Sequence, residues 1–206
     1  MFDSAYKNKK VLVTGHTGFK GSWLTLWLKE LGAEVVGLSN MEPTSPSNFI
    51  VSQVGSGIAD IREDVTNTEN LISILKKHKP EYVFHLAAQA LVKESFINPI
   101  LTIKTNVIGT ANLLEALRII NSETKAIFIT SDKAYDNQEW IWGYRENDRL
   151  GGKDPYSASK GMTELLIRTY NESFFNKPES KISTGIARAG NVIVGGDWSN
   201  DRIVPD

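Results

Sequence analysis

Short apolar runs alternate with longer amphipathic stretches along almost the whole chain of 206 residues, and this alternation restricts the possible fold more than any other feature. The runs are nearly continuous in apolar residues, which is typical of strands buried on both faces of a parallel sheet. Helical crossovers between such strands cover the sheet on both sides. The sequence therefore predicts an α/β fold built on a doubly wound parallel sheet.

The expected elements follow from the spacing of apolar residues and from turn residues. We expect strands at residues 11–13, 34–38, 57–60, 82–86, 126–130 and 182–187. We expect helices at residues 23–31, 70–77, 99–120 and 155–175. Asn98 is the expected N-cap of the third helix, because Pro99 suits its first turn. Two stretches, 41–57 and 136–153, are irregular and polar, and the second is long enough to be a functional loop.

The composition excludes several classes of function. Lys and Arg number 23 against 24 Asp and Glu, a net charge of −1, so we expect no nucleic acid and no anionic membrane as the main partner. The absence of cysteine excludes disulfides, zinc–thiolate sites and cysteine nucleophiles, and three scattered histidines do not suggest a metal site. The first ten residues do not resemble a signal peptide, and the most apolar stretch, 82–92, is too short to span a bilayer. We expect a cytoplasmic chain.

A glycine-rich turn lies between the first expected strand and the first expected helix, with the pattern G-x-x-G-x-x-G. Glycine allows a sharp turn there and lets a pyrophosphate approach the N–H groups at the start of the helix, where the dipole favours negative charge. The turn predicts a Rossmann-type dinucleotide-binding domain over residues 1–206. The alternative is a tight turn that needs glycine for packing alone. The expected cofactor-binding residues of the turn are Gly15, Thr17, Gly18, Phe19, Lys20 and Gly21.

The sequence does not decide the type of dinucleotide. An acidic residue after the second strand would take the ribose hydroxyls of NAD, but the chain has Ser39 and Asn40 there, so NADP is not excluded. Asp60 and Ile61 follow the third expected strand, where they are placed to flank an adenine. Asp60 is equally well explained as a turn or cap residue.

Tyr156 and Lys160 lie four residues apart at the start of an expected helix, so both project from one face. A phenol with a pKa of about 10 is a poor base at neutral pH, and a lysine ammonium beside it lowers that pKa. A Y-x-x-x-K pattern alone also occurs by chance in amphipathic helices. Here it accompanies the glycine turn and residues 130–133 at the end of the fifth strand, which is where ligands bind in open α/β sheets.

These segments together resemble the extended short-chain dehydrogenase/reductase family. Narrower stretches resemble the CDP-glucose 4,6-dehydratases within that family, and the resemblance covers essentially the whole chain. The stretches are residues 15–24, 130–137, 140–146, 188–193, 196–198 and 201–202. Ala134 and Val194 depart from the family pattern, which has cysteine and glycine there, and neither residue touches a proposed role.

The resemblance implies conversion of CDP-glucose to CDP-4-keto-6-deoxyglucose with NAD as a bound cofactor. Tyr156 would take the proton of the C4 hydroxyl, Lys160 would hold the nicotinamide ribose, and Ser131 would bond the C4 oxygen. Asp132 would be the acid at C6 and Lys133 the base at C5, which requires a neutral lysine. For the last two residues, the alternative is a solvated ion pair at the strand end.

Further residues follow from the same analogy. The expected lining of the cofactor is Leu86, Ala87, Ala88 and Gln89, although packing of small apolar residues explains them as well. Arg188 and Asn191 would face the sugar nucleotide, with a surface ion pair as the alternative for the arginine. Asn106 either bridges backbone groups near the site or faces solvent.

Two other functions stay open: another nucleotide-sugar epimerase or dehydratase of the extended family, and a non-catalytic NAD-binding protein. By analogy we expect a homodimer that forms a four-helix bundle from residues 99–120 and 155–175 of each copy. The chain ends where the family continues into a smaller substrate lobe. We therefore expect NAD binding with little or no turnover by these 206 residues.

Overall fold

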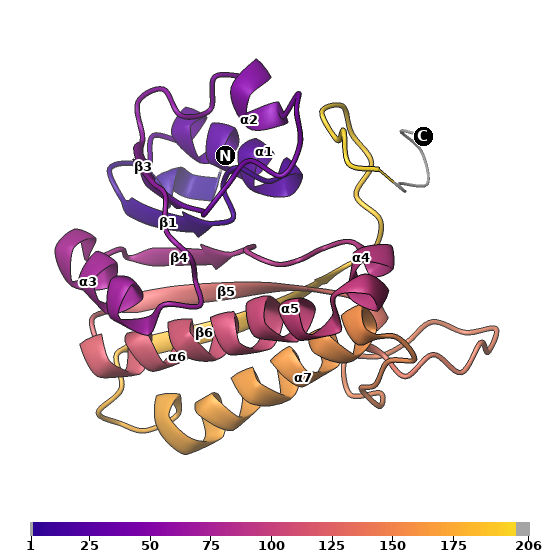
Figure 1. The fold of residues 1–206 in the computed structure, drawn as a ribbon. Helices are drawn as coiled ribbons and strands as arrows, with labels where there is room; N and C mark the ends of the chain where they lie inside the picture. Colours follow the sequence, from indigo (N-terminus) through magenta and orange to yellow (C-terminus); the bar gives the residue numbers. More distant parts are fainter. Residues whose placement is uncertain (1, 201–206) are drawn as a thin grey trace.

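A computed structural model describes residues 2–200 and confirms the doubly wound parallel sheet (Figure 1). Its six strands lie in the order β3-β2-β1-β4-β5-β6, and each neighbouring pair is parallel. The strands are β1 (Lys10–Thr14), β2 (Glu34–Leu38), β3 (Ala59–Ile61), β4 (Tyr82–His85), β5 (Thr124–Ser131) and β6 (Ile182–Ala189). The direction of progression reverses between β1 and β4, which creates a switch point at their carboxyl ends.

Helices connect the strands. They are α1 (Phe19–Glu30), α2 (Asn48–Val51), α3 (Thr68–His78), α4 (Val92–Ile97), α5 (Pro99–Ile103), α6 (Gly109–Ile120) and α7 (Pro155–Tyr170). A π-helical turn, η2 (Lys104–Ile108), joins α5 to α6, and another, η4 (Asn171–Phe175), extends α7. Short 3-10 turns are η1 (Phe2–Ser4) and η3 (Asp132–Ala134).

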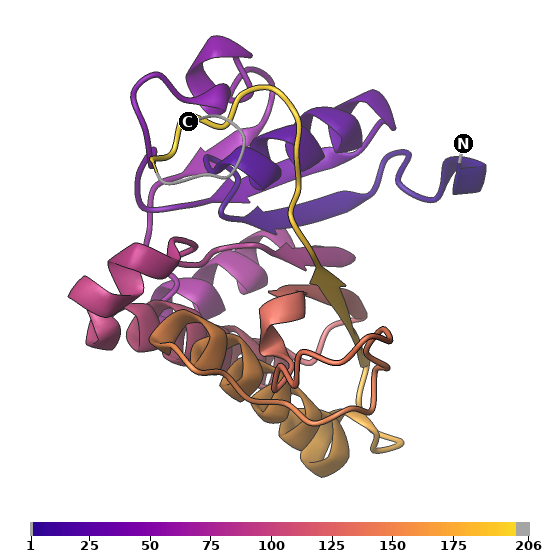
Figure 2. The same ribbon diagram turned by 90° about the vertical axis from the view of Figure 1, so that its right-hand side faces the viewer.

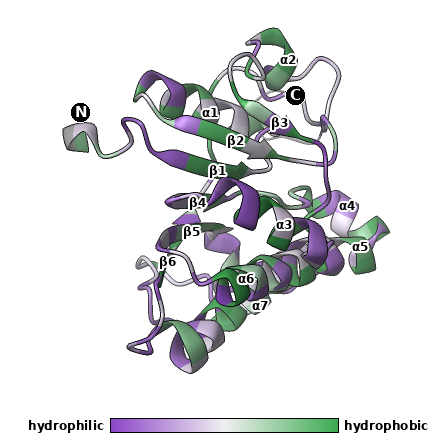
Figure 3. Ribbon diagram, turned by 90° about the vertical axis from the view of Figure 1, so that its left-hand side faces the viewer, coloured by the Kyte–Doolittle hydropathy of each residue, from purple (hydrophilic) through white to green (hydrophobic). Residues whose placement is uncertain are grey.

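Two apolar clusters show how the helices cover the sheet. On one face, Val11 and Val13 of β1 pack with Leu28 of α1. The larger cluster lies on the other face and joins strand residues such as Phe128 to α3, α6 and α7. Apolar and polar residues alternate along α6 and α7, as expected of helices with one buried side (Figure 3).

All six expected strands and all four expected long helices are present, with ends shifted by a few residues. Asn98 stands at the N-cap position of α5, but its amide donates to the Glu94 carboxylate and caps nothing. The sequence missed the short helices α2 and α4. Asp60 and Ile61 lie inside β3 and not after it, because Gly37 and Leu38 of β2 pair with them.

Two long segments leave the sheet at its carboxyl edge. Residues 136–153 project as a loop closed by a bridge between Tyr135 and Leu150 (Figure 1). After β6, residues 190–200 cross to the side of α1 and α2 (Figure 2), where the Trp23 indole N–H donates to the Gly195 carbonyl at 2.9 Å. Residues 201–202, which the resemblance includes, lie outside the described residues.

His85 is a buried polar link between the sheet and α6. Its Nδ1 lies 2.7 Å from the Thr14 hydroxyl and its Nε2 lies 3.0 Å from the Thr110 hydroxyl. Complete burial, with a smaller contribution from the charge of Lys160, lowers the pKa of His85 to about 3. The ring is therefore neutral in the folded protein at any pH near neutral.

We predict that His85 makes the fold sensitive to acid. A pKa that is lower in the folded than in the unfolded chain contributes stability that is present above pH 6.5 and is lost as the pH falls toward 3. Between pH 7.5 and 5, this one residue should remove about 2 kcal/mol from the free energy of unfolding. In urea titrations, the stability difference between wild type and His85→Gln should shrink by about that amount at pH 5. A constant difference across this range would contradict the prediction.

Candidate active site

The glycine turn is closely packed at two of its three glycines. Gly15 ends β1 with a φ of +74°, and a Cβ there would lie 2.7 Å from the backbone nitrogen of Ala87. A Cβ on Gly21 would lie 2.0 Å from the carbonyl oxygen of Gly15. Packing alone therefore requires glycine at both positions.

Gly18 differs from its two neighbours in the motif. It is the N-cap residue of α1, and no side chain caps the helix there. Among the described residues, an added Cβ would meet Gly15 O at 3.3 Å and nothing else within 4 Å beyond its immediate chain neighbours. The space beside the first turn of α1 is therefore open, as the approach of a pyrophosphate to this helix would require.

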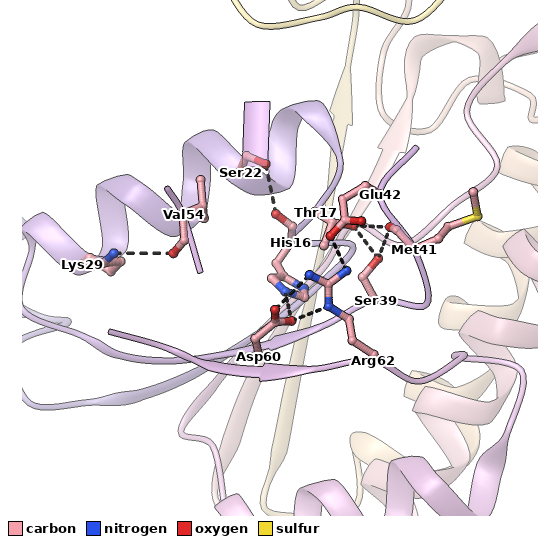
Figure 4. A network of polar contacts seen from close by, with 10 residues as sticks. All are labelled: His16, Thr17, Ser22, Lys29, Ser39, Met41, Glu42, Val54, Asp60 and Arg62. Carbon is pink, nitrogen blue, oxygen red and sulfur yellow. Dashed lines mark hydrogen bonds and ion pairs between the residues drawn. The ribbon is translucent and has the colours of Figure 1, made fainter. Parts of the chain in front are cut away.

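Thr17 ties the glycine turn to the segment after β2. Its hydroxyl lies 2.7 Å from the Ser39 hydroxyl and donates to the Met41 carbonyl at 2.6 Å (Figure 4). The hydroxyl thus has a structural role that the sequence did not reveal. Cofactor contact by Thr17 stays a prediction.

Tyr156 and Lys160 lie one turn apart on α7, and the Asp154 carboxylate caps this helix by accepting from the Ser157 backbone N–H at 2.9 Å. The Lys160 ammonium lies 5.8 Å from the centre of the Tyr156 ring and 3.5 Å from the Ile129 carbonyl of β5. These contacts place the pair beside the carboxyl end of β5.

Burial lowers the pKa of Lys160 to about 8, and the charge of Lys20 in the glycine turn adds to the effect, while Glu164 opposes it. Lys20 lies in the first turn of α1, beside the open space at Gly18, and a cation at a helix start suits an anionic ligand. The residues present therefore fit a dinucleotide.

The end of β5 is the third part of the candidate site, after the glycine turn and the Tyr156–Lys160 pair. The Ser131 hydroxyl donates to the Asp132 carboxylate at 2.9 Å and accepts from the Lys133 backbone N–H at 3.2 Å. Ser131 is buried, whereas Asp132 and Lys133 are exposed at the surface. Three of the four side chains predicted to act on the sugar thus follow one another at the end of β5 and in the turn η3.

Asn106 lies in the π-helical turn and is almost fully buried. Its amide accepts from the Gln89 N–H at 2.8 Å and donates to the Gln89 carbonyl and to the Ser159 hydroxyl. Of the two alternatives for this residue, the bridge is confirmed. The bridge joins the segment after β4, which contains Gln89, to α7, which contains Ser159. Ser159 in turn donates to the Tyr156 carbonyl at 2.6 Å.

Arg188 is held within the protein. Its guanidinium donates to both oxygens of the buried Glu164 carboxylate at 2.6–2.9 Å and lies 4.4 Å from the centre of the Tyr135 ring. Glu164 also accepts from the Thr130 hydroxyl at 2.6 Å. Arg188 therefore forms an ion pair with a buried carboxylate and not a surface pair, and its contact with a diphosphate stays a prediction. Glu164 was missed, because nothing in the sequence distinguishes it from a solvated residue of an amphipathic helix.

Asn191 is exposed, and the residues from Leu86 to Gln89 are partly buried after β4. The backbone N–H of Ala87 donates to the Thr14 hydroxyl at 3.2 Å.

Asp60 accepts from His16 at 2.9 Å and from Arg62 at 2.8 and 2.9 Å (Figure 4). Neither a turn nor a helix cap accounts for Asp60.

Comparisons with known proteins agree with this arrangement. The sequence model of the GDP-mannose 4,6 dehydratase family matches residues 12–181. The chain belongs to that family. CDP-glucose 4,6-dehydratase of Salmonella typhimurium is 49% identical over 204 residues, which cover 98% of this chain and 57% of that protein. GDP-mannose 4,6-dehydratase of Yersinia enterocolitica is 32% identical, covering 81% of this chain and 46% of that protein.

Solved structures show the same fold. UDP-glucose 4-epimerase of Thermotoga maritima, solved with UDP-glucose, superposes with a TM-score of 0.75 at 28% identity and covers 87% of this chain and 54% of that one. UDP-glucose 4-epimerase of Thermus thermophilus, solved with NAD, gives a TM-score of 0.72 at 30% identity with the same coverage of 87% and 54%. The chain thus spans about half the length of the relatives it matches.

Within residues 2–200, no group of three or more histidine, aspartate or glutamate side chains could hold a metal ion. Over the same part of the chain, no helix is long and apolar enough to cross a membrane.

We predict that Gly21→Ala strongly destabilises the fold, because the new methyl group would overlap the Gly15 carbonyl. Overpacking of this kind costs about 1–3 kcal/mol or more. Gly143→Ala is the matched control, since an added Cβ there meets nothing within 4 Å in the described chain. Urea unfolding midpoints of the two variants measure the difference. Equal midpoints would show that the turn relaxes without cost.

Proposed function

We propose that this chain supplies the cofactor-binding and catalytic part of a CDP-glucose 4,6-dehydratase. The observation that carries the proposal is the packing of α7, which holds Tyr156 and Lys160, against β5 and the turn η3 that follows it, where Ser131, Asp132 and Lys133 lie. The 49% identity to the Salmonella typhimurium enzyme supports the choice of CDP-glucose among nucleotide sugars.

The proposed cofactor is NAD. The glycine turn would hold its pyrophosphate beside α1, with Lys20 and Lys160 providing positive charge, and Lys160 would also hold the nicotinamide ribose. When bound, NAD supplies a hydride acceptor and donor next to the sugar.

Tyr156 is the proposed base for the C4 hydroxyl. With a pKa of about 8, Lys160 is mainly protonated at neutral pH even though it is buried. A buried ammonium beside the ring favours the phenolate, so Tyr156 can accept the sugar proton. Ser131, fixed between Asp132 and the Lys133 backbone, would orient the C4 oxygen.

Asp132 and Lys133 are the proposed acid and base of the dehydration. A carbonyl at C4 acidifies the C5 proton, which Lys133 would remove while Asp132 protonates the leaving C6 hydroxyl. Lys133 is exposed in the described chain, so closure of the site around the sugar would have to provide the desolvation that a neutral lysine needs.

A 4-epimerase is the second candidate function, and the likeness to UDP-glucose 4-epimerases supports it. Epimerisation at C4 needs neither a base at C5 nor an acid at C6. The Asp132–Lys133 pair therefore favours the dehydratase.

We predict that this chain, joined to the remaining part of the Salmonella typhimurium protein, forms CDP-4-keto-6-deoxyglucose from CDP-glucose. In the Lys133→Ala form of this chimera, the C5 proton should stay in place. Incorporation of solvent deuterium at C5, measured by NMR, should fall at least about a hundredfold, and NADH with CDP-4-ketoglucose should build up in the site to at most one equivalent per bound NAD.

The control variant is Lys177→Ala, which removes another exposed lysine, just after η4, and should keep the normal rate. Normal deuterium incorporation in Lys133→Ala would assign the C5 base to another group. A chimera that forms no 4-keto sugar, while the intact Salmonella enzyme does so in the same assay, would contradict the proposed function.

The proposed partner is a second copy of the chain. Leu101, Ile108 and Ile119 lie about half exposed along α5, η2 and α6, at spacings of seven and eleven residues that place them on one side of the continuous helix. Met162 and Leu165 are exposed on the neighbouring α7. An apolar stripe across two adjacent helices supports pairing into a four-helix bundle.

We predict that Ile108→Glu converts the dimer to a monomer, because a charge would be buried in the bundle. Ile50→Glu, which replaces an exposed isoleucine on α2, should leave the dimer intact. Sedimentation velocity at micromolar concentration distinguishes the two species. A wild-type monomer under these conditions would exclude the pairing.

A further inference from the structure

A chain of charged groups crosses the carboxyl ends of β2 and β3 (Figure 4). Arg62 lies at its centre and donates from Nε and Nη2 to the two oxygens of Asp60 at 2.8 and 2.9 Å. Its third nitrogen, Nη1, contacts the Glu42 carboxylate at 2.7 Å. His16 donates to Asp60 at 2.9 Å from the other side.

This network adjoins the glycine turn. Met41 precedes Glu42, and its carbonyl accepts from the Thr17 hydroxyl of the turn. In a dinucleotide-binding sheet, the segment after the second strand meets the adenosine ribose. A carboxylate there recognises the 2′-hydroxyl of NAD, and an arginine recognises the 2′-phosphate of NADP. Here both groups are present, and they are bound to each other.

We propose that Glu42 makes this chain select NAD over NADP by occupying the Arg62 nitrogen that a 2′-phosphate would need. The inference rests on the proposed dinucleotide function and extends it to cofactor selection. It also gives a role to the segment where the sequence, with Ser39 and Asn40, left the choice open.

The two carboxylates act differently on Arg62. Asp60 takes Nε and Nη2 in a bidentate pair, which fixes the plane of the guanidinium. The guanidinium also lies 5.0 Å from the centre of the buried Phe49 ring, which packs edge-on against His16. Arg62 would therefore keep its position without Glu42, and only Nη1 would become available.

Charge reinforces the selection. Glu42, Arg62 and Asp60 together carry one net negative charge, since burial lowers the pKa of His16 and favours its neutral form. A 2′-phosphate adds roughly −1.5 to −2 charge units beside them. Replacing Glu42 with glutamine makes the group neutral, and the neutral amide oxygen holds Nη1 less strongly than a carboxylate does.

The test is calorimetric titration of the purified chain with NAD and with NADP. In Glu42→Gln, we expect NADP to bind about tenfold more tightly than in wild type, because a dianionic phosphate competes for Nη1 more successfully with a neutral amide oxygen than with a carboxylate. NAD affinity should change by less than about threefold, since glutamine still offers an acceptor oxygen. Glu42→Ala should give the same gain for NADP and covers the case in which the glutamine variant folds poorly.

Two further variants isolate the mechanism. Glu63→Gln removes the same charge one residue from Arg62, but Glu63 contacts Asn70, so NADP binding should stay near the wild-type value. Adding Arg62→Gln to Glu42→Gln should abolish the gain. Wild-type binding of NAD together with unchanged NADP affinity in both Glu42 variants would overturn the inference and leave the proposed function standing. Failure of the wild-type chain to bind NAD at all would overturn both.

Discussion

The contact between the carboxyl ends of β1 and β4 determines where the site forms. The sheet grows from β1 through β2 to β3, and the chain then returns to add β4 on the opposite side of β1. At that point the backbone of Gly15 approaches Ala87 so closely that a side chain on Gly15 would overlap it. The segment after β1 and the segment after β4 diverge from this contact. Parallel sheets of this kind bind their ligands in the space between two such segments.

Buried charge beside this contact links the site to the core. Lys160 is buried, yet its pKa of about 8 keeps it mainly protonated at neutral pH, and its charge helps to keep His85 neutral underneath. One turn along α7, Glu164 holds Arg188 of β6 and Thr130 of β5. The ends of two strands are therefore anchored to the same helix that carries Tyr156 and Lys160, so packed elements and not loops fix the positions of these two side chains.

The sequence was sufficient to predict elements whose residues repeat a simple period. The strands and long helices were predictable because their burial imposes continuous or helical apolar spacing. The short helices α2 and α4 were not, because helices of four and six residues are too short to show a period. For the candidate site, the glycine turn and the Tyr156–Lys160 pair were predictable because each is a pattern of residues close together in the sequence.

Contacts between distant segments were not predictable. The Glu42–Arg62 pair depends on the register of β2 with β3, and the Arg188–Glu164 pair depends on how α7 packs beside β6. The position of His16 illustrates the problem. Its ring fits only because Gly37 of the neighbouring strand lacks a side chain, whose Cβ would lie 2.3 Å from the ring. Neither residue signals the other in the sequence, because their contact exists only after the strands have paired.

The charged groups at the two ends of the sheet's carboxyl edge differ in how deeply they are buried. Lys160 is buried, so salt screens its interaction with Tyr156 weakly. The side chains of Glu42, Asp60 and Arg62 are about one third exposed, so their ion pairs are screened more strongly. Selection between NAD and NADP at the β2–β3 end should therefore weaken with ionic strength, while activation of the phenol at the β5 end should persist. The bidentate geometry of Asp60 on Arg62 limits this weakening, because the direction of a hydrogen bond is retained when its long-range charge is screened.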